Sequence, residues 1–213
     1  MIEATYIDHM GSDLTVANAA RVSFGKKSEL EDDPWGPPVL KAKDDKLIRY
    51  LAAHKHISPF GHCFASFHIK APIFVARQLV KHKFLRWNEI SRRYTTENIE
   101  FYVPDIWRGQ SQDKKQGSDG EIQHIHIQTS QQIPLTLYEG LLDKGVCEEQ
   151  ARMVLPQNTM TEWYWSGSLD AFAAMCNLRC KPDTQEETRQ VANQIDRKMI
   201  ELFPVSWDAL TDD

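Results

Sequence analysis

The change of hydrophobic period at Pro72 constrains the fold of this chain more than any other feature. Apolar and polar side chains alternate over residues 63–70, which is typical of a strand with one buried face. Pro72 suits the first turn of a helix, and residues 73–84 continue in a helical pattern. A strand that leads directly into a helix predicts a domain in which both kinds of element share one core.

Helical patterns account for most of the remaining apolar residues. Three helices have a recognisable start: at Asp13, at Ser168, and at Thr184, which has capping-box spacing to Glu187. The expected helices are residues 14–24, 46–54, 135–145 (closed by Gly145), 147–155 (closed by Pro156), 169–179, and a last helix with the apolar stripe Val191, Ile195, Met199 and Leu202.

Two polar stretches interrupt this pattern and are expected to be exposed loops. Residues 26–45 carry three prolines, a glycine and mixed charges, and residues 107–132 are poor in core residues. Residues 99–104 favour a strand ended by its proline, and no internal repeat is present. We therefore expect one α+β domain over residues 1–213, helix-rich with a small central sheet.

Charge and hydropathy disfavour two classes of partner. The net charge is −5, so the chain as a whole has no electrostatic sign of binding nucleic acid. No run of eighteen apolar residues exists, and the N-terminus is acidic where a signal peptide is basic. The expectation is a soluble protein with neither a membrane nor a nucleic-acid partner, located in the cytoplasm, or in the host cytoplasm if the chain is viral.

The cysteines and the histidine-rich turn give little reason to expect a metal. Four cysteines are too few and too scattered for a disulfide framework in a chain of 213 residues. Cys176 and Cys180 share one helical face, but two thiols alone do not make a zinc site. Turn geometry and capping account equally well for His54, His56 and His62. We expect no metal.

The segment from Gln78 to Tyr94 is the richest in chemistry. Within it lie two lysines, three arginines, a histidine, a glutamate, an asparagine and a serine. The cations suit a phosphate, while amides and hydroxyls suit a base or a sugar. A solvated basic face and a nucleic-acid patch, with Trp87 or Tyr94 as a stacking platform, are the alternatives. Because Gln78 and His82 are four apart on one helical face, we favour a pocket wall.

This segment resembles the signature of the flavin-dependent thymidylate synthases, which is Arg-His-Arg, two residues, Ser, one residue, Asn-Glu, one residue, Ser, one residue, Arg. Five of its eight fixed positions match, two are Arg-to-Lys changes, and Arg86 replaces a serine. The resemblance continues in the family's order over most of the chain. The segments that carry it are DLTVANAARVSF, HKHISPFGH, FHIKAPIFVARQ, RRY, EFYVP, EEQARMVLP and CNLR.

The resemblance implies FAD as cofactor, and methylation of deoxyuridine monophosphate (dUMP) at C5 with methylenetetrahydrofolate and NADPH, giving thymidylate. It also implies a homotetramer whose sites form where subunits meet. Carried over by position, the nucleotide site comprises Gln78, Lys81, Glu89, Ser91, Arg93, Arg152 and Arg179. The flavin site comprises Ser23, Ser58, Lys81, His82, Lys83 and Glu89, with His56 close to the flavin ring.

The chain departs from the family pattern at several flavin contacts. Lys81 and Lys83 keep the charge of arginine but lose its planar fork. Family members often carry Asn, Arg and Asn near the start of the CNLR helix. In this chain, those positions are Ser168, Asp170 and Ala174. An aspartate where a cation usually lies is unfavourable beside phosphate.

The resemblance assigns catalytic roles to Arg179 and His56. We expect Arg179 to lie against the N3–C2–O2 edge of uracil and to stabilise the charge that develops as C5 attacks. No cysteine has an obvious activating partner, which agrees with a route that needs no cysteine nucleophile. Ser91 is expected to bind rather than react, and no GxGxxG segment is present for NADPH.

Two other functions stay open from the sequence. The replaced signature positions allow the same scaffold to hydroxymethylate a pyrimidine deoxynucleotide. The cations of residues 81–93 allow a non-catalytic nucleic-acid-binding module. A flavin spectrum and product analysis separate these three.

Overall fold

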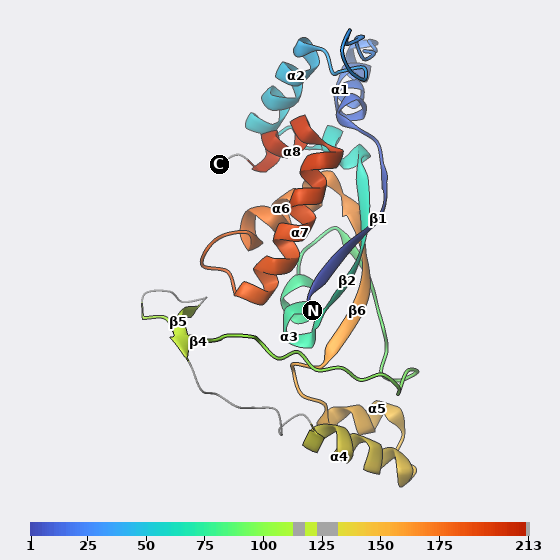
Figure 1. Ribbon diagram of the computed structural model, residues 1–213. Helices are drawn as coiled ribbons and strands as arrows, with labels where there is room; N and C mark the ends of the chain where they lie inside the picture. Colours follow the sequence, from blue (N-terminus) through green and yellow to red (C-terminus); the bar gives the residue numbers. More distant parts are fainter. Residues whose placement is uncertain (113–117, 123–131, 212–213) are drawn as a thin grey trace.

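A four-stranded antiparallel sheet forms the centre of the molecule. The computed structural model describes residues 1–112, 118–122 and 132–211 (Figure 1). The strand order is β1-β2-β6-β3. The strands are β1 (Glu3–Met10), β2 (Phe64–Pro72), β6 (Met160–Ser168) and β3 (Leu85–Glu89). The strand expected near residues 63–70 is confirmed as β2.

The central strand β6 is the main element that the sequence analysis did not assign. It pairs with β2 on one side and β3 on the other, and Trp165 lies opposite both Phe67 and Trp87. Trp163 and Trp165 alternate with polar residues and are buried. A Cβ on Gly167 would come 3.0 Å from the carbonyl oxygen of Phe84, so glycine allows β3 to approach closely.

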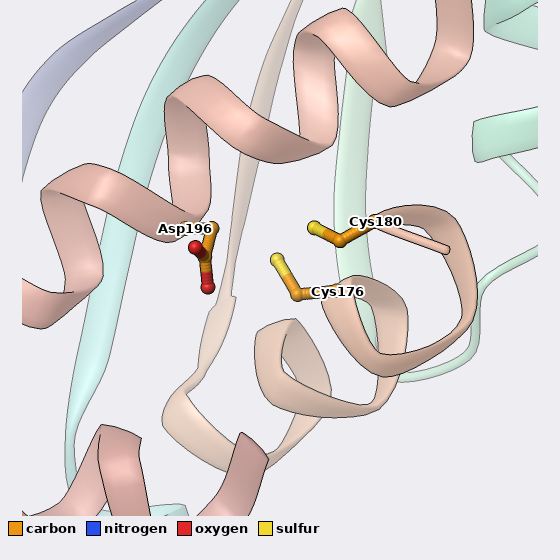
Figure 2. A group of neighbouring side chains, drawn as sticks. All are labelled: Cys176, Cys180 and Asp196. Carbon is orange, nitrogen blue, oxygen red and sulfur yellow. The ribbon is translucent and has the colours of Figure 1, made fainter. Parts of the chain in front are cut away.

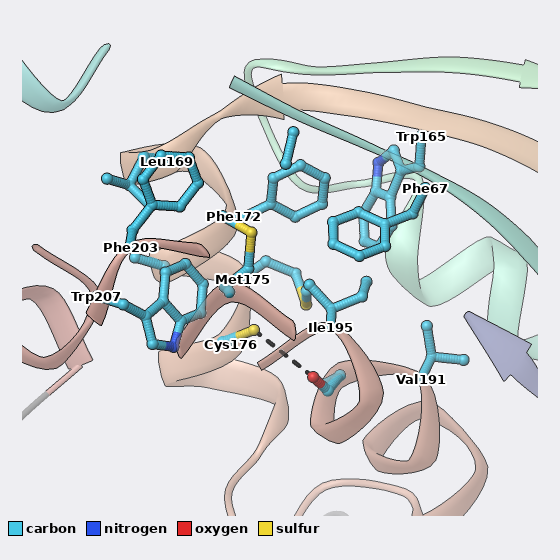
Figure 3. Close-up of a cluster of buried hydrophobic side chains, with 14 of the residues drawn as sticks. Phe67, Trp165, Leu169, Phe172, Met175, Cys176, Val191, Ile195, Phe203 and Trp207 are labelled. Carbon is cyan, nitrogen blue, oxygen red and sulfur yellow. Dashed lines mark hydrogen bonds between the residues drawn. The ribbon is translucent and has the colours of Figure 1, made fainter. Parts of the chain in front are cut away.

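Helices α6 (Leu169–Arg179) and α7 (Glu186–Leu202) cover one face of this sheet (Figure 1). Ser168 is the N-cap residue of α6, as expected. The predicted stripe of α7 is confirmed, because Val191, Ile195 and Met199 are fully buried and Leu202 packs at the edge of the core. Figure 3 shows Val191 and Ile195 in the same buried cluster as Trp165, Phe172, Phe203 and Trp207.

The cap predicted at Thr184 is wrong. Gln185 is the N-cap residue of α7, and the Thr184 hydroxyl donates to the Leu178 carbonyl oxygen at 3.1 Å. Thr184 therefore closes the loop back onto α6, and Glu187 is occupied elsewhere, accepting from Arg108.

Helices α1 (Asp13–Arg21), α2 (Ala42–Ala53) and α8 (Pro204–Thr211) lie at one end of the sheet (Figure 1). Ser12, not Asp13, is the N-cap residue of α1. The Asp13 carboxylate instead accepts from the backbone N–H groups of Val205 and Ser206, at 3.0 and 2.9 Å. The cap predicted at Asp13 is therefore wrong for α1, and the carboxylate caps the start of α8 instead.

The loop expected at 26–45 is shorter, because α2 begins at Ala42. Two contacts anchor it. Asn18 pairs with the backbone of Ser28, and the buried carboxylate of Asp44 accepts from the Ser28 hydroxyl and from Arg21. A bridge joins Glu31 to Val39. The 3₁₀ turns η1 (Val22–Phe24) and η2 (Ser58–His62) follow α1 and α2.

Helix α3 (Ile73–Leu79) follows Pro72 as predicted but ends five residues before Phe84. Phe84 has φ of 64° and turns the chain into β3. The predicted strand at 99–104 is reduced to a single bridge between Phe101 and Thr159. Side chains of residues 80–84 therefore lie on a turn rather than on a helical face.

The polar excursion at 107–132 contains a two-stranded ribbon, β4 (Trp107–Gln110) and β5 (Ser118–Ile122), which was not predicted. Its residues 113–117 and 123–131 lie outside the described residues.

A short helical hairpin projects from the end of the sheet opposite α1 and α2 (Figure 1). It consists of α4 (Gln132–Asp143), α5 (Glu148–Ala151) and the turn η3 (Arg152–Val154). Gly145, at φ of 80°, ends α4 as predicted. Among the described residues, no helix has the length and apolar character needed to cross a membrane.

Candidate functional site

Arg179 and His82 form the most distinctive polar pair of the predicted site. Arg179 is the last residue of α6 and is half-buried, and its Nε donates to Nε2 of His82 at 3.0 Å. Burial, together with the charge of Arg179, lowers the pKa of His82 to about 4. The imidazole is therefore neutral near pH 7 and accepts the hydrogen bond.

The rest of the Arg179 guanidinium is available to a ligand. Burial lowers its pKa, but no carboxylate of the described chain forms an ion pair with it. Within the same described part, its two terminal nitrogens have no hydrogen-bond partner. A half-buried planar fork with unused donors suits a planar acceptor edge or an anion.

Gln78 is already engaged within the chain. Its amide nitrogen donates to Gln185, and its amide oxygen accepts from the Thr188 hydroxyl at 3.2 Å. The network continues from Gln185 to Glu187, at 3.1 Å. Gln78 thus joins α3 to the start of α7, while its role towards a nucleotide stays a prediction.

Glu89 is fixed between two strands at the edge of the sheet. One carboxylate oxygen accepts from the Thr161 hydroxyl on β6 at 2.7 Å, and the other accepts from the Trp87 indole at 3.1 Å. Sequence reasoning missed Thr161 because β6 was not assigned. The apolar alternation around Trp163 and Trp165 was the available signal.

Ser91 and Arg93 lie on a turn directly after β3. The Ser91 carbonyl oxygen accepts from the backbone N–H groups of Tyr94 and Thr95, at 2.9 and 3.0 Å. Arg93 is exposed, lies 5.1 Å above the Tyr94 ring and donates to its hydroxyl at 2.9 Å. This turn presents a cation and a hydroxyl together.

Three exposed cations, Lys81, Lys83 and Arg86, surround Phe84, whose side chain is 83% exposed. In the part of the chain that the structure describes, none of the three forms an ion pair. Unpaired cations around an exposed aromatic ring form a surface suited to phosphate groups.

Ser58 belongs to η2, which packs against α1 and α6, while Ser23 belongs to η1 after α1 and His56 precedes η2. The exposed His56 ring is 6.3 Å from the rings of both Tyr50 and His54, which stack on each other. This aromatic surface suits a flat ligand ring.

Asp170, in the first turn of α6, points towards this η2 segment. Its Oδ1 is buried and has no hydrogen-bond partner among the described residues. A Cβ on Gly61 of η2 would lie 3.9 Å from it. Ser168 is buried and Ala174 is exposed on the same helix. A buried carboxylate oxygen without a donor is costly unless a ligand or a neighbour supplies one.

Arg152 forms no hydrogen bond or ion pair with the other predicted site residues among the described ones. It is exposed on the α4–α5 hairpin, and its Nε donates to the Glu149 carbonyl oxygen at 3.3 Å. Figure 1 shows the hairpin at the far end of the sheet from α1 and η2. The predicted site residues therefore come from several elements spread along the sheet.

The cysteines are mostly poor nucleophiles. Burial raises the pKa of the Cys63 thiol to about 11 and raises that of Cys176 well above its ordinary value. The pKa of Cys180 is lowered by its side-chain interaction with Cys176.

Comparisons with known proteins agree on one family. A family model described as thymidylate synthase complementing protein matches residues 5–205. A flavin-dependent thymidylate synthase of Thermus thermophilus is 40% identical over 207 residues, covering 95% of this chain and 73% of that protein. One from Thermotoga neapolitana is 38% identical over 204 residues, covering 95% and 88%.

A solved structure leads to the same group of proteins. The UMP/dUMP methylase PolB from Streptomyces cacaoi, bound with 5-Br dUMP, has a TM-score of 0.86 and 31% identity to this chain. The match covers 100% of this chain and 95% of that one.

Proposed function

Because the chain belongs to the thymidylate synthase complementing protein family, we propose that it methylates dUMP with carbon from methylenetetrahydrofolate and electrons from NADPH. The resemblance read from the sequence is confirmed, and so is the α+β fold class. The enzyme type is that of the flavin-dependent thymidylate synthases, with FAD as cofactor. The observation that carries the residue assignment is the half-buried guanidinium of Arg179 with two unused donors.

The donor set of the chain fits FAD. Lys81, Lys83 and Arg86 are unpaired cations of the kind a pyrophosphate requires, and the aromatic surface at His56 suits a flat ring. Bound FAD supplies the redox chemistry that turns the transferred one-carbon unit into a methyl group. We assign Ser58 and Ser23 to the same site as hydrogen-bonding groups.

We assign charge stabilisation on the pyrimidine to Arg179. Attack by C5 requires electron density at that carbon, and negative charge develops along the N3–C2–O2 edge. The neutral His82 imidazole holds Nε of Arg179, which leaves the two terminal nitrogens for that edge. A neutral partner leaves the positive charge of the guanidinium uncompensated, so it acts fully on the ligand.

We assign phosphate and sugar binding to Ser91, Arg93 and Arg152. Ser91 and Arg93 share one turn, and Arg152 lies on the α4–α5 hairpin. We propose a homotetramer in which Arg152 serves the site of a neighbouring subunit. The hairpin supports this, because Met153 and Ile133 are 76% and 70% exposed, which is unfavourable in water.

The departures from the family pattern lie at positions assigned to the flavin, and one of them, Lys81, is also assigned to the nucleotide. Lys81 and Lys83 offer point charges in place of forked donors, and Arg86 adds a third cation on β3. Asp170 has a carboxylate oxygen without a donor beside η2. A ligand group with an N–H or O–H at that place would satisfy it.

Arg179→Ala tests the assignment. Removing a donor used in the transition state should lower turnover by about 10²–10³-fold while flavin content and fold persist. The control is Arg49→Ala, which removes a surface arginine paired with Asp45 and Asp208 and should leave turnover unchanged. Near-normal turnover in Arg179→Ala would reject the role. The mass of the product distinguishes methylation from the alternative hydroxymethylation.

A further inference from the structure

A cluster of three ligand-type side chains lies beside α6, apart from the proposed nucleotide and flavin contacts. The thiols of Cys176 and Cys180 and a carboxylate oxygen of Asp196 all lie within 4.8 Å of one another. Figure 2 shows the two thiols of α6 and the carboxylate of α7 pointing towards a common space. The sequence spacing identified only Cys176 and Cys180, and the packing of α7 against α6 adds Asp196 as a third candidate ligand.

We propose that Cys176, Cys180 and Asp196 bind a divalent cation of the zinc class. Thiolate sulfur and carboxylate oxygen together suit Zn²⁺ or Co²⁺, with tetrahedral geometry and one position left for water. In such a site the ligand atoms lie about 3.7 Å apart, given Zn–S of ~2.3 Å. The three side chains therefore need to close by about an ångström at most.

The surroundings of the cluster favour a cation. Cys180 is the C-cap residue of α6, and the C-terminal end of a helix carries partial negative charge. The Trp207 indole donates to Asp196 Oδ1 at 2.8 Å and so fixes the carboxylate from behind. Such an outer hydrogen bond is the usual means of orienting a metal ligand.

The cluster is also accessible. It lines an open cavity of about 340 Å³, together with Asn177, Lys181, Ile200 and Thr211. Cys176 is buried at the base of the cavity and Cys180 is half-buried. The cavity gives an ion an entry route and leaves room for a water as fourth ligand. Arg179 is not part of its lining, since it extends towards His82.

Metal binding to the two cysteines is accompanied by the release of their thiol protons. The Cys176 thiol donates to the Ala192 carbonyl oxygen at 3.7 Å in the structure. When the metal binds, both thiols release their protons to solvent and form metal–sulfur bonds. No oxidant or reductant takes part. The bound ion would join the end of α6 to the middle of α7.

Cobalt titration of the full-length, flavin-containing protein tests the proposal. The thiols are first reduced with a phosphine, and each spectrum is taken against the same sample without metal, which cancels the flavin. We expect one Co²⁺ per chain, a thiolate-to-cobalt charge-transfer band, and its displacement by Zn²⁺. Zn²⁺ should also raise Tm of the wild type and not of Cys180→Ser.

The variants decide whether the band comes from this cluster. Cys180→Ser should abolish the band, and Asp196→Asn should weaken binding by about 10–100-fold, the range for a lost metal partner. Cys147→Ser is the matched control, since Cys147 is exposed at the start of α5 and distant from the cluster. The proposal is overturned by the absence of a band, by a band that survives in folded Cys180→Ser, or by one that disappears in Cys147→Ser.

Discussion

Two regions assigned to the same nucleotide site differ in how complete they are within a single chain. At the end of α6, Arg179 is half-buried and held by His82, and Gln78 has two side-chain partners from α7. On the α4–α5 hairpin, Arg152 is exposed, and its one hydrogen bond within the described residues is to a carbonyl oxygen three residues earlier. The difference teaches that the residues assigned to the base are held by side chains of the same chain, and it motivates our proposal that Arg152 serves a neighbouring subunit.

The largest effect is expected from mixing two inactive variants. If Arg152 serves a neighbouring subunit, a site needs Arg179 from one chain and Arg152 from another. Co-refolded Arg179→Ala and Arg152→Ala chains should then regain about a quarter of the wild-type activity, because random mixing makes that share of sites intact. The measurement is thymidylate formation by the mixture and by each variant alone.

The same experiment distinguishes the opposite arrangement. If both arginines act within one chain, mixed chains contain no intact site and the mixture stays as inactive as its parts. Mixing Arg179→Ala with Arg49→Ala is the control. It should give about half of the wild-type activity in either arrangement, because half of the chains retain both site arginines.

Gln78→Leu tests the hydrogen-bond network that joins α3 to the start of α7. The substitution removes both hydrogen bonds and leaves Gln185 and Thr188 without this partner. The free energy of unfolding should fall by about 1–3 kcal/mol, the usual cost of leaving such groups unsatisfied. Lys81→Ala, at an exposed position three residues later, should change it by less than ~0.5 kcal/mol. Equal stability of the two variants in urea titrations would contradict the network.

His82 should make the stability of this region depend on pH. Its pKa is about 4 in the folded chain and 6.5 for an unperturbed histidine, so the unfolded chain binds more protons between these values. The contribution of His82 to the free energy of unfolding is therefore fully present above pH 6.5 and is lost as the pH falls towards 4. Because the ring is only half-buried, the loss should be on the order of 1 kcal/mol.

Unfolding free energies measured between pH 7 and pH 4.5, with and without His82→Gln, check this sign. The glutamine oxygen can still accept from Arg179 but does not titrate in this range. The part of the pH dependence of the unfolding free energy that comes from residue 82 should disappear in the variant. A slope that persists unchanged would assign the pH dependence to other groups.

The sequence predicted the elements whose signals are local. The alternation of residues 63–70, the proline at 72 and the stripe of Val191, Ile195 and Met199 each need only their own segment, and all are confirmed. Strand β6 has an equally local signal in its alternating tryptophans, but the sequence analysis left it unassigned. Its omission hid the partner that holds Glu89.

Other features could not be predicted because they depend on contacts between distant segments. Asp13 has the chemistry of a cap, but only the packing of α8 decides which helix it caps. Arg179 and His82 are separated by 97 positions, and the lowered pKa of His82 follows from that contact. The third ligand of the cysteine cluster, Asp196, likewise comes from another helix.

The smallest effect is expected on FAD affinity at residues 81 and 83, where this chain has lysine in place of the forked arginine donors of its family. Lys81 and Lys83 lie on the exposed turn around Phe84, and Arg86 follows on β3. If Arg86 has taken over a cation role, changing both lysines to arginine adds crowding and repulsion, and FAD binding should weaken a few-fold. Arg86→Ser should weaken it as well. We favour this outcome, because the third cation lies three residues after Lys83 and five after Lys81. Titration of FAD into wild type, the double variant and Arg86→Ser measures the affinity.

Tighter binding in the double variant, with no effect of Arg86→Ser, would instead mean that Lys81 and Lys83 have merely lost the bidentate contacts that arginine makes. Equal affinity in all three proteins would remove this turn from the flavin site and leave the cofactor to the surface around His56.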